Sequence, residues 1–134
     1  MIVREYKMRV WYVDTDQMGI VHHSNYVRYY EAARSDLMRE FGMSYAEIEK
    51  GGIMLPVLEV NSKYHAPIYY DELITVEISI DEVPKARIKF NYRIFNEKKE
   101  LVNTGHVVLG FMHSDTRRPT RAPEWFVKMA EDNL

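Results

Sequence analysis

One stretch with helical spacing interrupts a chain that otherwise alternates with a period of two. Between Ser24 and Phe41, over about five turns, apolar residues recur every three or four positions: Val27, Tyr30, Ala33, Leu37, Met38 and Phe41. Such a helix must bury its apolar stripe, and the rest of the chain offers mostly strands to cover it. The sequence therefore predicts an α+β fold in which a sheet curls around this one long helix.

The helix has recognisable signals at both ends. Ser24 and Asn25 are residue types that cap a helix N-terminus with a side-chain oxygen. Gly42 follows the last apolar position, where glycine readily adopts the left-handed conformation that ends a helix. Ser44 and Glu47 have the spacing of a capping box, which predicts a short second helix that two consecutive glycines end.

The remaining segments alternate between apolar and polar residues, as strands do. We expect strands over residues 2–13, 53–65 with an interruption at Pro56, 73–80, 86–95 and 101–113, and a helix over 124–133. Short polar turns between the later strands make them antiparallel hairpins. The sequence thus predicts one domain over residues 1–134, with about five antiparallel strands around the long helix.

The composition narrows the possible functions. The net charge of −2 does not favour nucleic-acid binding, because such domains usually carry a basic excess. The chain has no cysteine, which excludes disulfides, thiol nucleophiles and cysteine-based zinc sites. No stretch approaches the ~20 apolar residues of a membrane helix, and the N-terminus lacks the apolar run of a secretory signal. We expect a cytoplasmic protein with no nucleic-acid partner and no membrane span.

Several catalytic motifs are missing. No serine lies in Gly-x-Ser-x-Gly, and the glycines form neither a P-loop nor a dinucleotide-binding fingerprint. The five histidines do not form His-Glu-x-x-His, and the adjacent side chains of His22 and His23 diverge if the backbone is extended. We therefore expect neither a metal site nor a cofactor.

The segment 12–26 holds the chemistry-bearing residues that remain. Asp14 and Asp16 are two positions apart, so they face the same side if the segment is extended. A carboxylate near the unpaired N–H groups of a helix start suits a reaction that develops an oxyanion. The alternative is that the aspartates and Gly19 are ordinary turn residues and that His23 is a packing residue.

A set of residues at fixed spacing carries a family resemblance: Asp14, Asp16, Gly19, Val21, His23 and Tyr26. This run resembles the signature of the 4-hydroxybenzoyl-CoA thioesterase family of hotdog-fold proteins. Within the family it is most similar to the acyl-CoA thioesterases associated with the Tol–Pal gene cluster. The stretches from Gly51 to Val57 and from Tyr64 to Leu73 are similar to further family segments. The order of elements matches the hotdog fold over nearly the whole chain.

The resemblance implies a catalytic role for Asp16. This residue would be the nucleophile that attacks the thioester carbonyl, or the general base that activates a water molecule. Asp14 would be structural. His23 would assist proton transfer or orient the carboxylate, and Tyr26 would line or support the site.

The resemblance also implies where the substrate binds. In the family a backbone N–H at a helix N-terminus holds the thioester oxygen, and the candidates here are the turn around Gly19 and the stretch containing Met54 and Leu55. Basic side chains suit the phosphates of CoA. Lys85 and Arg87 lie at the start of the strand expected over 86–95, and three more follow the last strand: Arg117, Arg118 and Arg121. Each is equally well explained as a solvated turn residue.

Three functions on this fold stay open. The first is hydrolysis of an acyl-CoA, and the second is non-catalytic binding of acyl-CoA or acyl carrier protein. The third is a hydratase or dehydratase, for which the long helix offers Glu31 and Asp36. A single curled sheet leaves an open edge, and the family pairs two such sheets with the site between subunits. We therefore expect a homodimer or a homotetramer.

Overall fold

The computed structural model describes residues 1–134, and the order of its main elements is the predicted one. The five long strands are β1 (Ile2–Arg9), β3 (Val57–Tyr64), β4 (Leu73–Ile80), β5 (Arg87–Phe95) and β6 (Leu101–His113). The short strands are β2 (Ile53–Met54) and β7 (Pro119–Thr120). The helices are α1 (Tyr26–Glu40), α2 (Tyr45–Lys50) and α3 (Glu124–Asn133), and the 3₁₀ turns are η1 (Tyr12–Asp14) and η2 (His23–Asn25). No helix combines the length and apolar composition that a membrane crossing requires.

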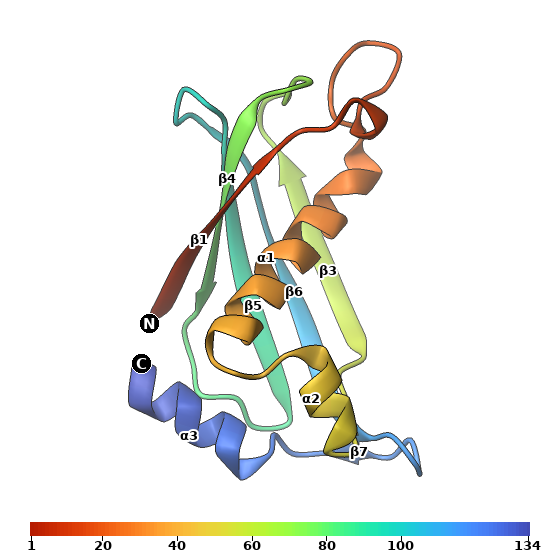
Figure 1. Cartoon of the computed structure of the whole chain (residues 1–134), viewed down its shortest axis with the longest axis vertical. Helices are drawn as coiled ribbons and strands as arrows, with labels where there is room; N and C mark the ends of the chain where they lie inside the picture. Colours follow the sequence, from red (N-terminus) through yellow and green to blue (C-terminus); the bar gives the residue numbers. More distant parts are fainter.

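The sheet is antiparallel throughout. Its long strands lie in the order β1-β4-β5-β6-β3, so that β1 and β3 form the two edges, and β2 and β7 pair with the end of β6. Figure 1 shows α1 crossing one face of this curved sheet, with α2 and α3 at the end away from η1. The predicted α+β hotdog architecture is confirmed.

The core forms between α1 and the inner face of the sheet. On β4, every second side chain is almost completely buried, from Ile74 to Ile80, and β5 continues the alternation from Ile88 to Ile94. This pattern was predicted for both strands, except that Ala86 is exposed and lies before β5. Regular alternation places one complete face of each strand against the helix, so the helix is held by the apolar residues of the sheet.

The buried stripe of α1 differs from the prediction at both ends. Val27 is 41% exposed and Phe41 is only partly buried, while Tyr26 and Tyr29 lie inside. The helix begins at Tyr26, after the turn η2, and its two aromatic residues in the first turn take the inner positions. Aromatic rings bury more surface than valine.

The predicted N-terminal cap of α1 is wrong. The side chain of Asn25 makes no capping bond; its Nδ2 donates instead to the backbone carbonyl of Asp14, at 2.9 Å. The hydroxyl of Ser24 is hydrogen-bonded to Nδ1 of His22 at 2.8 Å. Both side chains therefore hold the loop that precedes the helix rather than the helix itself.

The predicted end of α1 is confirmed. Gly42 has a φ of +73°, and the N–H of Met43 donates to the carbonyl of Met38 at 2.8 Å, as in a Schellman motif. The hydroxyl of Ser44 then accepts the N–H of Glu47 at 3.2 Å and caps α2.

The first strand is shorter than predicted. β1 ends at Arg9, and Tyr12 lies in the turn η1 with its side chain exposed, although the predicted strand covers residues 2–13. Pro56 separates β2 from β3 as predicted. The early end of β1 leaves residues 10–25 free to fold back toward the start of α1.

Candidate active site

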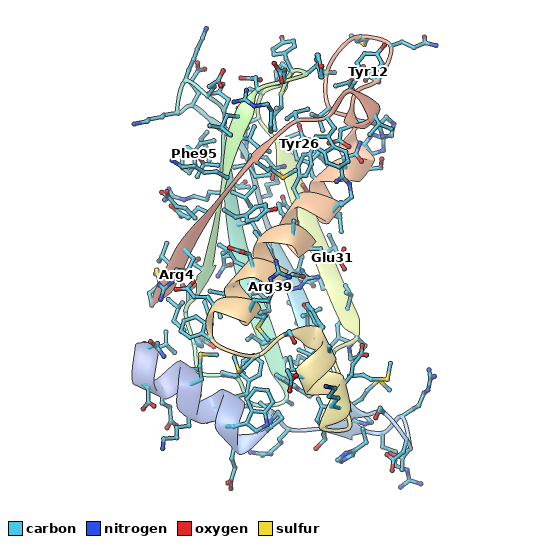
Figure 2. The ribbon with its side chains drawn as sticks, viewed as in Figure 1. Arg4, Tyr12, Tyr26, Glu31, Arg39 and Phe95 are labelled. Carbon is cyan, nitrogen blue, oxygen red and sulfur yellow. The ribbon has the colours of Figure 1, made fainter.

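An open pocket of about 460 Å³ lies where the chain passes from η1 into α1. Three segments line it, namely the loop after η1, the first turn of α1 and the end of β3. The lining residues are Asp16, Ile20, Val21, His22, His23, Tyr26, Tyr64, His65, Ala66 and Pro67. In Figure 2 the labelled Tyr12 and Tyr26 mark this end of the molecule. The structure thus brings Asp16, His23 and Tyr26 together.

Asp16 lies in a tight, hydrogen-bonded turn. Its N–H donates to the carbonyl of Ile20 at 2.8 Å, and its carbonyl accepts the N–H of Gly19 at 3.0 Å. Gly19 has a φ of +77°, which glycine adopts without strain. Oδ1 of Asp16 accepts the N–H of Met18 at 2.8 Å, while Oδ2 has no partner in the chain. One carboxylate oxygen therefore holds the turn, and the other is left without a partner in a residue that lines the pocket.

A free backbone donor stands at the start of the helix. The N–H of His22 donates to the carbonyl of Asp14 at 2.9 Å, and the N–H of Ser24 donates to the His22 ring at 3.2 Å, but the N–H of His23 has no acceptor. η2 leads directly into α1, so this N–H lies at the positive end of the helix dipole. By contrast, the N–H of Gly19 is already used within its turn.

His22 and His23 do not diverge as the sequence predicted. Their ring centroids are 4.1 Å apart, because the chain turns into η2 at this point instead of continuing extended. Both side chains are exposed at the pocket. The hydroxyl of Tyr64 donates to the carbonyl of His23 at 3.4 Å, which joins the end of β3 to the start of the helix.

Tyr26 forms the buried wall of the pocket. Its ring meets Tyr64 edge-on at a centroid distance of 4.9 Å and Tyr29 at 6.0 Å. Burial, with smaller contributions from Tyr64 and Tyr30, raises the pKa of Tyr26 to about 12. The phenol therefore stays neutral at physiological pH.

This raised pKa predicts a loss of stability at alkaline pH. An unfolded tyrosine ionises near pH 10, whereas the pKa of Tyr26 in the folded state is about 12. The contribution of Tyr26 to the free energy of unfolding is complete below pH 10. It is lost as the pH rises toward 12, because the unfolded state then releases the proton first. Urea denaturation should show a lower free energy of unfolding at pH 11 than at pH 9, and this difference should be smaller in Tyr26→Phe. Exposed Tyr12→Phe is the control, and an equal fall in Tyr26→Phe and wild type would contradict the assignment.

Asp14 lies behind the pocket and has partners of its own. Its carboxylate forms an ion pair with Arg28 and accepts the hydroxyl of Tyr29 at 2.9 Å. The expectation that Asp14 and Asp16 face the same side of an extended segment is wrong, because η1 ends at Asp14 and turns the chain. Burial, followed by the hydrogen bond to Asp14, raises the pKa of Tyr29, so its hydroxyl remains a donor.

The remaining predicted residues lie at the other end of the sheet. Tyr64, at the pocket, pairs with Asn103 of β6, whereas Met54 pairs with Met112 of the same strand. Asn103 and Met112 are nine residues apart, which is about 30 Å along a strand that rises about 3.3 Å per residue. Lys85 and Arg87 are at the turn between β4 and β5, which is also at that end. Within one chain, none of the following predicted residues lies near Asp16: Met54, Leu55, Lys85, Arg87, Arg117, Arg118 and Arg121.

Several residues of the pocket were not predicted as site residues from the sequence. The segment from Tyr64 to Pro67 lines the pocket because β3 ends beside the first turn of α1. The family resemblance of the stretch from Tyr64 to Leu73 was the available signal, but only the pairing of β3 with β6 shows which residues of it reach the pocket. His22 is not among the residues that carry the family resemblance, which include His23 instead.

Comparison of the whole chain with models of known protein families shows the family to which it belongs. A family model described as the thioesterase-like superfamily matches residues 10–129. The chain belongs to this superfamily. The match confirms the thioesterase resemblance of the segment 12–26, and it extends from the end of β1 into α3.

The chain is similar to two curated relatives and to one solved structure. The acyl-CoA thioesterase YbgC of Haemophilus influenzae is 30% identical, over 80% of this chain and 82% of its own. The acyl-CoA thioester hydrolase YbgC of Escherichia coli is 28% identical, over 90% of both chains. The crystal structure of a DHNA-CoA thioesterase from Staphylococcus aureus is 37% identical, with a TM-score of 0.89 over 98% of this chain and 88% of that one.

Proposed function

We propose that this protein hydrolyses an acyl-CoA thioester to a free acid and CoA. The observation that carries the proposal is a pocket lined by two residues with unused groups: Asp16 has a carboxylate oxygen without a partner, and His23 has a backbone N–H without an acceptor. Thioester hydrolysis needs a base or nucleophile and a donor for the oxyanion, and these two groups meet both needs. The names of the YbgC relatives support the same reaction.

The chemistry follows from these two groups. The Asp16 carboxylate either attacks the thioester carbon itself, giving an acyl anhydride that water then hydrolyses, or removes a proton from the water that attacks. In both cases negative charge develops on the carbonyl oxygen and is stabilised by the His23 N–H. The carbon–sulfur bond breaks and CoA leaves as a thiolate, which is a good leaving group. A strong general acid is therefore not required.

The proposal is tested by measuring thiol release from a panel of acyl-CoA substrates that differ in chain length and aromaticity. Hydrolysis of at least one of them is expected. Two other functions have distinct outcomes in the same experiment. A non-catalytic module would show binding of acyl-CoA or acyl carrier protein without thiol release, and a hydratase would add water to an enoyl-CoA.

The two ends of the sheet would form one site in a dimer. β3 is an open edge with exposed apolar side chains, at Val57, Leu58, Val60 and Tyr64, each between 43% and 55% exposed. An open apolar edge strand readily pairs with another strand. If two copies pair through β3 about a two-fold axis, the strands run antiparallel. The end of one copy that carries Met54, Lys85 and Arg117 then approaches Asp16 of the other.

The dimer proposal predicts the effect of a charge on this edge. Val60→Glu should convert the dimer to a monomer, because it places an unpaired carboxylate in an apolar strand contact. Light scattering coupled to size exclusion measures the mass directly. Val3→Glu is the matched control, since Val3 is equally exposed, at 40%, on the opposite edge strand β1. A monomeric wild-type protein, or a dimer in Val60→Glu, would rule out pairing through β3.

The role of the His23 N–H predicts a difference between two variants. His23→Ala removes only the imidazole, whereas His23→Pro also removes the N–H. Proline is tolerated at the first position of a helical turn, and His22 has the φ of −67° and ψ of 139° that suit a residue before proline. We expect kcat of His23→Pro to be about 10²-fold below that of His23→Ala. Equal rates in the two folded variants would show that this N–H does not hold the oxyanion.

A further inference from the structure

The backbone carbonyl of Asp14 joins η1 to the start of the helix. It accepts two hydrogen bonds of 2.9 Å, one from the N–H of His22 and one from the side-chain amide of Asn25. These two donors flank His23, whose own N–H is the free donor of the pocket. The position of that N–H therefore depends on the position of Asp14.

The side chain of Asp14 fixes the same junction from the other side. It is 2% exposed, ion-paired with Arg28 and hydrogen-bonded to the hydroxyl of Tyr29, and both partners lie in the first turn of α1. Oδ2 also accepts the N–H of Trp11 at 3.4 Å. A buried carboxylate requires such compensation, and removing it would weaken the attachment of η1 to the helix start.

The loop between these anchors carries Asp16. The loop closes on itself through the bridge between Thr15 and Val21, and the N–H of Val21 donates to the carbonyl of Ile68 at 2.8 Å. These bonds hold the loop together and attach it to the segment before β4. Its connection to the first turn of α1 is made by Asp14.

We propose that Asp14 is a positioning residue that sets the separation between the Asp16 carboxylate and the His23 N–H. The inference rests on the proposed hydrolysis, in which both groups act on one carbonyl. A misplacement of about 1 Å between reacting groups can lower a rate by about 10²-fold. Asp14 itself does not line the pocket, so it acts through the two groups that do.

The test compares two matched tyrosine variants and one aspartate variant. Tyr29→Phe removes the hydroxyl that Asp14 accepts. Tyr92→Phe removes an equally buried hydroxyl that accepts Nη1 of Arg34 at 3.1 Å and lies outside the pocket. Asp14→Asn keeps the shape and removes the charge. We expect kcat to fall about tenfold in Tyr29→Phe and about 10²-fold in Asp14→Asn with little change in KM, and kcat of Tyr92→Phe to stay within about twofold of wild type.

Amide hydrogen exchange gives a readout that does not depend on catalysis. Peptides that cover residues 15–25 should exchange about tenfold faster in Tyr29→Phe and Asp14→Asn, and at the wild-type rate in Tyr92→Phe. Unchanged exchange in Tyr29→Phe, or faster exchange with an unchanged kcat, would overturn the inference. A wild-type protein that hydrolyses no acyl-CoA would overturn the proposed function instead, and exchange would still decide whether Asp14 orders this segment. Tyr29→Phe keeps the test decisive if Asp14→Asn does not fold.

Discussion

Asp16→Asn is expected to lower kcat for acyl-CoA hydrolysis by about 10³-fold, because asparagine is neither a nucleophile nor a base at neutral pH. The variant should keep its fold. An asparagine side-chain oxygen can still accept the N–H of Met18, which is the bond that holds the turn. Thiol release under saturating substrate measures kcat, and the melting temperature shows that the protein remains folded.

Asp132→Asn is the control for this substitution, since Asp132 is exposed on α3 at the other end of the molecule. A folded Asp16→Asn variant with wild-type kcat would remove Asp16 from the mechanism. A single turnover in ¹⁸O-labelled water tests the nucleophilic role of the wild-type carboxylate. Label in Asp16 shows that it was the nucleophile and that water opened the anhydride at the Asp16 carbon. Label only in the released acid is the result for a general base, and also for an anhydride that water opens at the acyl carbon.

Gly105→Ala is expected to destabilise the fold by about 3 kcal/mol or more and to lower the melting temperature by about 10 °C or more. A Cβ at this position would overlap the backbone carbonyl of Asn61 and the hydroxyl of Tyr30. Neither neighbour can move easily, because Asn61 belongs to β3 and the Tyr30 hydroxyl is held by Ser62 and Asn103. Thermal and urea denaturation measure this loss of stability.

A second glycine of β6 provides the control. In Gly110→Ala the new Cβ would approach Cδ1 of Leu58 at 3.1 Å, and this exposed side chain can rotate away. Its cost should stay below about 1 kcal/mol. Gly105→Ala should cost less in a Tyr30→Phe background than in the wild-type protein, since the hydroxyl is one of the three atoms that lie within 3.0 Å of the new Cβ. Equal losses at Gly105 and Gly110 would show that the close approach at Gly105 is not the cause.

Elements with strong periodicity were predictable from the sequence. The alternation of β4 and β5, the glycine that ends α1 and the cap of α2 all depend on neighbours within a few residues, so local sequence determines them. The start of α1 was less predictable. Asn25 has the right side chain for a cap, but the carbonyl of Asp14, eleven residues earlier, takes its hydrogen bond.

The sequence by itself determined the α+β order of elements, because short-range periodicity carries that information. Through its resemblance to a known family, it also indicated the hotdog fold, the thioesterase family and the segment in which Asp16, Gly19 and His23 lie. Only the tertiary structure decided which groups face the pocket. The N–H of His23 has no acceptor, whereas those of His22 and Ser24 are bonded, and Tyr64 reaches Tyr26 because β3 pairs with β6. These hydrogen bonds and contacts join residues that are distant in the chain, so the local sequence does not indicate which partner each group finds.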